Sequence, residues 1–123
     1  MEQRPAIKKA KVHVDTSLEE AFQNTVLRPV IKMKHELLIA YFKQYIANRK
    51  FDFTVLSLEK RLEYVSSCLE QDQTLRSELR GIIIGQFTID EYVEYQHISK
   101  AVNKRILNII KKRVIDHIDV LSH

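Results

Sequence analysis

Apolar residues recur at helical spacing along most of this chain. Between residues 57 and 72 they stand at Leu58, Leu62, Val65 and Leu69. Between residues 72 and 85 they stand at Leu75, Leu79, Ile82 and Ile83. Steps of three and four place side chains on one face of an α-helix. Two helices, each with one buried face, are therefore predicted in the middle of the chain.

Helix-start signals divide the first half of the chain. Ser17 followed by Glu20 has the spacing of a capping box and begins a short helix that runs toward Arg28. Pro29 then either kinks that helix or begins a new one in its first turn. Helical spacing continues through residues 30–48, so a bent helical arm is predicted.

Residues 49–56 lose this periodicity and are predicted to form a connector. Its apolar side chains are expected to pack into the core, and they are Phe51, Phe53 and Leu56. Ser57 is predicted to cap the next helix, which ends near Asp72. Asp72 or Thr74 then caps the helix after it.

The end of that fourth helix and the start of the next are marked closely together. Gly85 stands where a left-handed residue commonly ends a helix. Thr88 and Glu91 have capping-box spacing, and Phe87 and Tyr92 occupy the positions of a hydrophobic staple. This is the clearest helix boundary in the sequence.

The helical pattern that begins at Ile89 can continue to Leu121. Such a helix of about 33 residues would be roughly 50 Å long, whereas a domain of this size has a diameter of about 35 Å. Either the helix breaks near Ser99, or it projects beyond its own domain. A projecting apolar stripe would be available to a second copy, which is the physical reason for expecting a homodimer.

Two glycines and two prolines leave few tight turns, and the sequence therefore predicts an all-α fold. We expect a single domain at residues 15–123, a four- to five-helix bundle with a long C-terminal helix. Residues 1–14 are expected to form a mobile, basic arm. The chain is long enough to bury a core without disulfides or metals.

Composition places the protein among ordinary globular domains, with 45% hydrophobic and 29% charged residues. No apolar run reaches membrane-spanning length, and the first residues lack the apolar segment of a signal peptide. The single Cys68 agrees with a reducing compartment and is expected to be an inert thiol beside the core. A cytoplasmic location without membrane contact is therefore expected.

Formal charge is distributed unevenly along the chain. Residues 1–14 sum to +3, residues 15–56 to +1, residues 57–94 to −4 and residues 95–123 to +4. Basic ends thus flank an acidic middle. The opposite charges can neutralise one another within one chain if the middle helices lie beside the C-terminal helix. Alternatively, they can do so between two chains by antiparallel self-association.

The longest predicted helix carries six basic residues and no acidic one between Lys100 and Arg113. Five of them share one arc of roughly 140°, and they are Lys100, Lys104, Arg105, Lys111 and Lys112. The other arc is apolar except for Arg113, and contains Ile98, Val102, Ile106, Ile109, Ile110 and Val114. Either the basic face is simply solvated, or it meets an acidic partner.

Little in the sequence indicates catalysis. Gly81 and Gly85 end a helix and lack the Lys-Ser or Lys-Thr of a phosphate loop, so we expect a neighbouring helix to pass closely over Gly81. Glu94 and His97 have the Glu-x-x-His spacing of di-iron bundles, but no second pair accompanies them. We therefore assign no metal, cofactor or catalytic residue, and an enzyme is not the favoured class.

A pocket between helices is one remaining possibility for a small ligand. Five tyrosines are the candidates to line it, at Tyr41, Tyr45, Tyr64, Tyr92 and Tyr95. The alternative is that these rings lie at the edge of the core with their hydroxyls in water.

Four runs of the sequence resemble a family of short, functionally uncharacterised bacterial proteins, at residues 22–32, 54–64, 81–92 and 103–110. The resemblance covers most of the chain beyond the N-terminal arm. Some members of that family carry the label glyoxalase. Metal-dependent glyoxalases are built from β-rich modules that supply His and Glu ligands, and this chain has neither feature. The resemblance therefore implies no catalytic residue.

The favoured hypothesis is a non-enzymatic helical bundle that acts through protein contacts, with self-association first. Its interface would include Val102, Ile106, Ile109 and Arg113. The isoleucines would be the anchors, and Arg105, Lys112 and Arg113 would be interface or rim charges. The alternative is non-specific nucleic-acid binding through the basic face of the C-terminal helix, assisted by Lys8, Lys9 and Lys11 in the arm. A small-ligand or metal-dependent enzyme is a third class.

Overall fold

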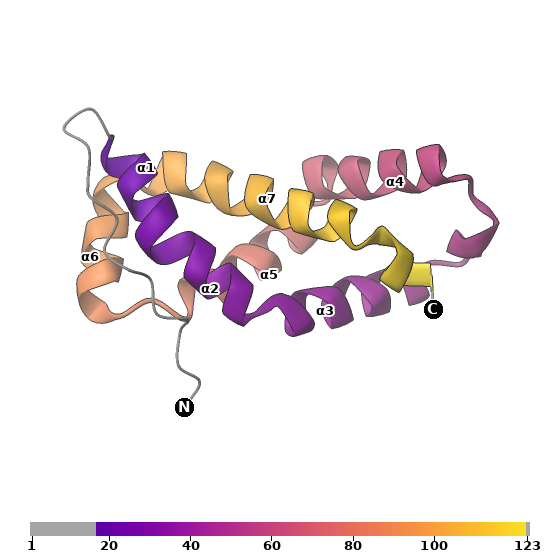
Figure 1. Cartoon of the computed structure of the whole chain (residues 1–123), viewed down its shortest axis with the longest axis horizontal. Helices are drawn as coiled ribbons and strands as arrows, with labels where there is room; N and C mark the ends of the chain where they lie inside the picture. Colours follow the sequence, from indigo (N-terminus) through magenta and orange to yellow (C-terminus); the bar gives the residue numbers. More distant parts are fainter. Residues whose placement is uncertain (1–16, 123) are drawn as a thin grey trace.

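A computed structural model of the protein describes residues 17–122. These residues form helices and helical turns with no strand among them, which confirms the all-α class (Figure 1). In chain order the elements are α1 (Leu18–Phe22), η1 (Gln23–Leu27), α2 (Arg28–Met33), α3 (His35–Ala47), η2 (Phe53–Val55), α4 (Leu58–Gln71), α5 (Gln73–Ile84), α6 (Ile89–His97), α7 (Ser99–Asp116) and η3 (Ile118–Ser122). The predicted arm at residues 1–14 lies outside the described residues.

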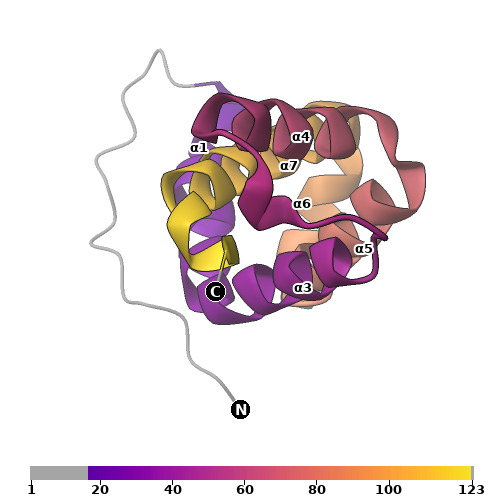
Figure 2. The same cartoon turned by 90° about the vertical axis from the view of Figure 1, so that its right-hand side faces the viewer.

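Helix α7 is the central element of the bundle. It runs along the length of the molecule and contacts each of the helices α1 to α6 (Figure 1). Seen from the end, α3, α4, α5 and α7 surround a common core (Figure 2). The side chains that α7 contributes to this core include Val102, Ile106, Ile110 and Val114. Burying each such side chain stabilises the fold by about 1.5–3 kcal/mol, so α7 holds the bundle together.

The bend at Pro29 takes an unusual local form. Arg28 donates its backbone N–H five residues back to the Gln23 carbonyl, in the π-helical turn η1. The wider turn accommodates Pro29, which has no N–H to donate and stands in the first turn of α2. Residues 30–48 are two helices rather than the one predicted, because Lys34 (φ −93°, ψ 11°) leaves the helical conformation between α2 and α3.

The connector is confirmed, but only one of its two aromatic residues is buried. Phe53 is buried in η2, whereas Phe51 is 42% exposed and only touches the Tyr64 ring, at a centroid distance of 5.0 Å. The connector crosses the end of the bundle beside η3 (Figure 2). Ser57 caps α4 as predicted, accepting from the Lys60 N–H at 3.2 Å. Leu58 is exposed, because it begins the helix at the solvent-facing end.

The predicted end of α5 at Gly85 is confirmed, but the left-handed conformation predicted for Gly85 and the close helix predicted over Gly81 are wrong. Gly85 follows α5 with right-handed backbone angles (φ −61°, ψ −13°). Gly81 is exposed, and a Cβ added to it would meet no heavy atom within 4 Å, so no helix passes over it. The cap at the start of α5 is Asp72, whose Oδ1 accepts from the Leu75 N–H at 3.1 Å.

The capping box at the start of α6 is confirmed. Thr88 Oγ1 accepts from the Glu91 N–H at 3.2 Å, and Glu91 Oε1 accepts from the Thr88 N–H at 2.8 Å. The ring contacts of Phe87 run to Phe22 and Tyr95. These contacts hold α6 against the start of the bundle.

The long C-terminal pattern is broken at Ile98 (φ −133°, ψ 23°), next to the predicted position. The break separates α6 from α7, which spans 18 residues and fits within the domain. Because α7 does not project, the original reason for expecting a homodimer no longer applies.

Candidate functional site

A groove with basic walls lies between α7 and the segment formed by η1 and α2. It encloses about 700 Å³ and is open to solvent. Its charged side chains are five cations and one carboxylate, namely Arg28, Lys104, Arg105, Lys112, Arg113 and Asp116. Between them lie Gln23, Ala101, Asn108, Ile109 and His117. We call this surface the basic groove.

Neutral partners position two of its cations. Arg105 Nη1 donates to Gln23 Oε1 at 2.9 Å, which joins α7 to η1 across the groove. Arg28 Nε donates to Asn24 Oδ1 at 3.3 Å. Because amide oxygens orient a guanidinium without neutralising it, both positive charges remain available to an anion.

Two lysines form the solvent-exposed rim of the groove. Lys112 pairs with Asp116 at 3.0 Å, with both side chains more than half exposed. An exposed pair of this spacing stabilises by only about 0.3–0.5 kcal/mol, so another carboxylate can compete for Lys112. Lys104 is exposed and has no ion-pair partner within residues 17–122.

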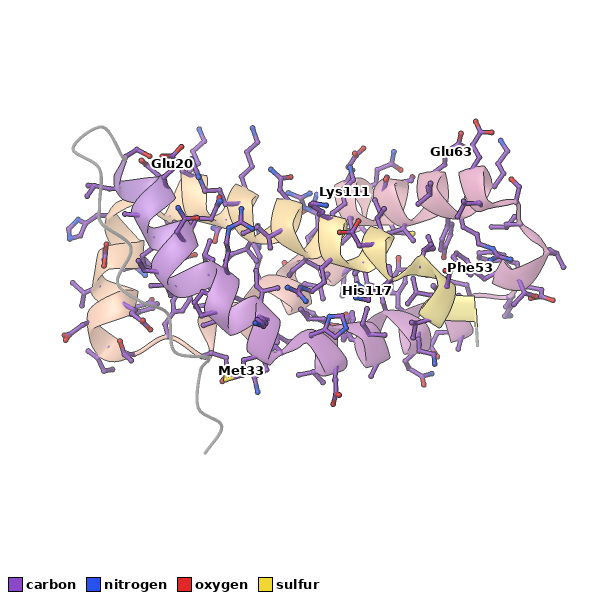
Figure 3. The ribbon with its side chains drawn as sticks, in the orientation of Figure 1. Glu20, Met33, Phe53, Glu63, Lys111 and His117 are labelled. Carbon is purple, nitrogen blue, oxygen red and sulfur yellow. The ribbon has the colours of Figure 1, made fainter. Side chains whose placement is uncertain are left out.

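The groove replaces the single basic stripe that the sequence predicted. Lys104, Arg105 and Lys112 belong to it, but Lys100 is exposed outside it, and Lys111 faces α4. Lys111 Nζ pairs with Glu70 at 3.1 Å (Figure 3). The acidic middle of the chain therefore neutralises part of the C-terminal helix inside the fold, which was one of the two expected outcomes.

Arg113, which lines the groove, is hydrogen-bonded to each of two neighbouring histidines. Its Nη1 donates to His35 Nδ1 at 3.1 Å, and His117 Nδ1 donates to the Arg113 carbonyl at 2.7 Å. The two imidazole rings meet edge to face at 4.5 Å, with His117 on the side of α7 near α3 (Figure 3). Burial lowers the pKa of His35, and the neighbouring His117 and Arg113 lower it further against an opposing effect of Glu36.

Arg113 is also incompletely bonded. Its Nε is buried and has no hydrogen-bond partner among the described residues. A buried donor without a partner costs about 1–3 kcal/mol. The guanidinium lines the groove with one of its donors unsatisfied.

Two of the four predicted interface residues are not available to a partner. Val102 and Ile106 are 0% exposed, because the apolar arc of α7 faces the core of its own chain. Ile109 and Arg113 line the basic groove and remain candidates for contact. Sequence reasoning missed Arg28 and Gln23, which no local spacing connects to α7.

Glu94 and His97 lie on the solvent-exposed side of α6. Across residues 17–122 no group of three or more His, Cys, Asp and Glu side chains is placed to hold a metal ion. The sequence-predicted pair therefore gains no further ligand from the described part of the fold.

The tyrosines do not converge on one site. Tyr41 donates to Glu78 and Tyr45 to Asp72, between α3 and α5, where a shallow cleft of about 420 Å³ lies. Burial and these carboxylate partners raise the pKa of both phenols. Tyr92 and Tyr95 belong to α6, at the other end of the bundle. The Tyr41 and Tyr45 bonds join α3 to α5 and are structural.

The fold and the site together define an all-α bundle with one basic groove beside its central helix. No helix within residues 17–122 is both long and apolar enough to cross a membrane. Comparison with protein-family models, curated proteins and solved structures finds no match.

Proposed function

We propose that this protein is a non-enzymatic, cytoplasmic binding module that holds an acidic protein segment in its basic groove. The observation that carries the proposal is the charge of the groove, where five cations face one carboxylate. Such a concentration of one sign attracts an anionic partner and accelerates its association.

The apolar residues of the groove favour a protein partner over a nucleic acid. Ala101 and half-buried Ile109 lie between the cations. They suit a peptide whose aliphatic side chains alternate with carboxylates, because apolar anchors flanked by charge pairs are typical of protein interfaces. A nucleic-acid backbone would use the same cations but leave Ile109 unused.

The test is fluorescence anisotropy with two labelled probes, an acidic amphipathic peptide of Glu and Leu and a random-sequence DNA. We expect the peptide to bind more tightly, and its affinity to fall between about 50 and 200 mM salt because exposed charges are screened. Lys104→Glu combined with Lys112→Glu should weaken peptide binding at least tenfold, which is about 1.4 kcal/mol.

The matched control is Lys50→Glu combined with Lys60→Glu, which makes the same change in net charge at exposed positions that do not line the groove. It should leave peptide affinity nearly unchanged. Tighter binding of DNA, lost with the groove variant and kept in the control, would replace our proposal with the nucleic-acid alternative. Equal losses in both variants would show that only net charge matters.

A further inference from the structure

Helix α6 presents an unpaired apolar ridge to solvent. Ile89 is 81% exposed and Val93, one turn later, is 54% exposed, with half-exposed Tyr92 beside them. Asp90 and Glu94, also exposed and one turn apart, form a parallel acidic row. The outer face of α6 therefore combines aliphatic side chains with carboxylates, the chemistry that the basic groove requires.

The groove is longer than helix α6 and can accommodate its whole length. The groove follows α7 from Ala101 to Asp116, about 22 Å at 1.5 Å per residue. The nine residues of α6 span about 13 Å. A helix of that length can lie along part of the groove with its apolar ridge toward the apolar lining and its acidic row toward the lysine rim.

We infer that the acidic segment bound by the basic groove is helix α6 of a second copy of this chain, an assignment that rests on the function proposed above. Within residues 17–122 no segment covers Ile89 and Val93, which leaves both side chains open to contact with another molecule. Charge complementarity favours α6 against the groove, because the acidic row then meets Lys104 and Lys112. Pairing α6 with α6, or groove with groove, would place like charges together.

This pairing is heterologous, since each molecule offers two different surfaces. After one contact the pair therefore retains a free groove on one copy and a free α6 on the other, and assembly continues into chains unless it closes. One short helix in one groove makes a small interface, which is typical of weak, transient association. Self-association should accordingly appear at high concentration and fall with salt.

Sedimentation equilibrium of the full chain from micromolar to millimolar concentration tests the pairing. The groove variant is Lys104→Glu with Lys112→Glu, and the ridge variant is Val93→Lys with Glu94→Lys. All four positions are exposed, and circular dichroism verifies that both variants keep their helices. Wild type should associate with increasing concentration, whereas each variant alone should remain a monomer.

Mixing the two variants gives the sharpest result. The groove variant retains an unchanged α6, and the ridge variant retains an unchanged groove. The equimolar mixture should therefore form a complex of two chains and no larger one. The control, Glu36→Lys with Leu37→Lys, changes an adjacent exposed acidic and apolar pair on α3 and should associate like wild type.

Association of the ridge variant at wild-type strength overturns the pairing, as does a wild type that stays monomeric at millimolar concentration. Neither result affects the acidic peptide probe, which should still bind the ridge variant because its groove is intact. If that probe also fails to bind wild type, the proposed function falls together with the pairing.

Discussion

Replacing Gly81 by alanine should stabilise this protein. Gly81 lies within α5, three residues before its end, and has an ordinary negative φ. It is exposed, and an added Cβ would have no heavy atom within 4 Å. A methyl group placed there meets nothing and disturbs no packing, so only the conformational effect of the substitution remains.

The magnitude follows from helix propensity and chain entropy, which describe the same effect and are not added together. Alanine favours a helix interior over glycine by about 0.8–1.0 kcal/mol, and restricting the unfolded chain stabilises by about 0.4–1 kcal/mol. We expect a gain of about 0.5–1 kcal/mol. At the entropy of unfolding of a chain this long, the midpoint of thermal unfolding should rise by about 2–4 °C.

Urea denaturation followed by far-UV circular dichroism measures the gain, with the slope on denaturant expected to be unchanged. Gly85→Ala is the matched comparison, because its Cβ would lie 3.0 Å from the Gly81 carbonyl oxygen and 3.7 Å from that of Ile82. That variant should gain less or lose stability. A loss of stability in Gly81→Ala would refute the reasoning, because it would mean that another segment covers this face of α5.

Three further changes test other parts of the structure. Thr88→Ala should lower the free energy of unfolding, measured by chemical denaturation, by about 1 kcal/mol because it removes the cap of α6. Thr88→Ser should retain most of the stability that the cap provides. Ile106→Ala should cost about 2–5 kcal/mol because the side chain is fully buried, while Ile89→Ala on the exposed ridge should cost far less; similar losses would contradict the burial of α7. Because the pKa of His35 is lowered in the folded chain, the unfolded chain binds a proton at this residue at a higher pH than the folded chain does. The free energy of unfolding should therefore be highest above the ordinary pKa of 6.5 and decline as pH falls below it. His35→Gln should flatten the decline in stability below pH 6.5, measured as the free energy of unfolding in urea at a series of pH values.

Features encoded by neighbouring residues were predictable from the sequence. The caps at Ser57, Asp72 and Thr88 each join a side chain to a backbone N–H three residues later, so spacing alone reveals them. The buried stripes of α4, α5 and α7 follow from periodicity for the same reason. All-α architecture then follows, because such stripes must be covered by one another.

Features set by tertiary packing were not predictable in this way. Gly81 has the same sequence context whether or not a helix crosses it, and only the arrangement of the bundle leaves it open. The basic groove depends on a bond between Arg105 and Gln23, which are 82 residues apart. Lys111 belongs to the same sequence pattern as Lys112, yet α4 lies close enough to pair it with Glu70. Composition cannot distinguish a neutralised lysine from an available one.

Arg113 was nevertheless a visible sign of the site, because it interrupts the apolar arc of α7. A local rule that is broken without a local gain often marks a functional position. Here the guanidinium bonds His35 but leaves Nε buried and unsatisfied within the described fold. Arg113 as a whole is only partly buried, and its buried Nε without a partner costs free energy, so stability does not explain an arginine there. Its place in the lining of the basic groove does, since the proposed carboxylate partner would meet this charge beside His117.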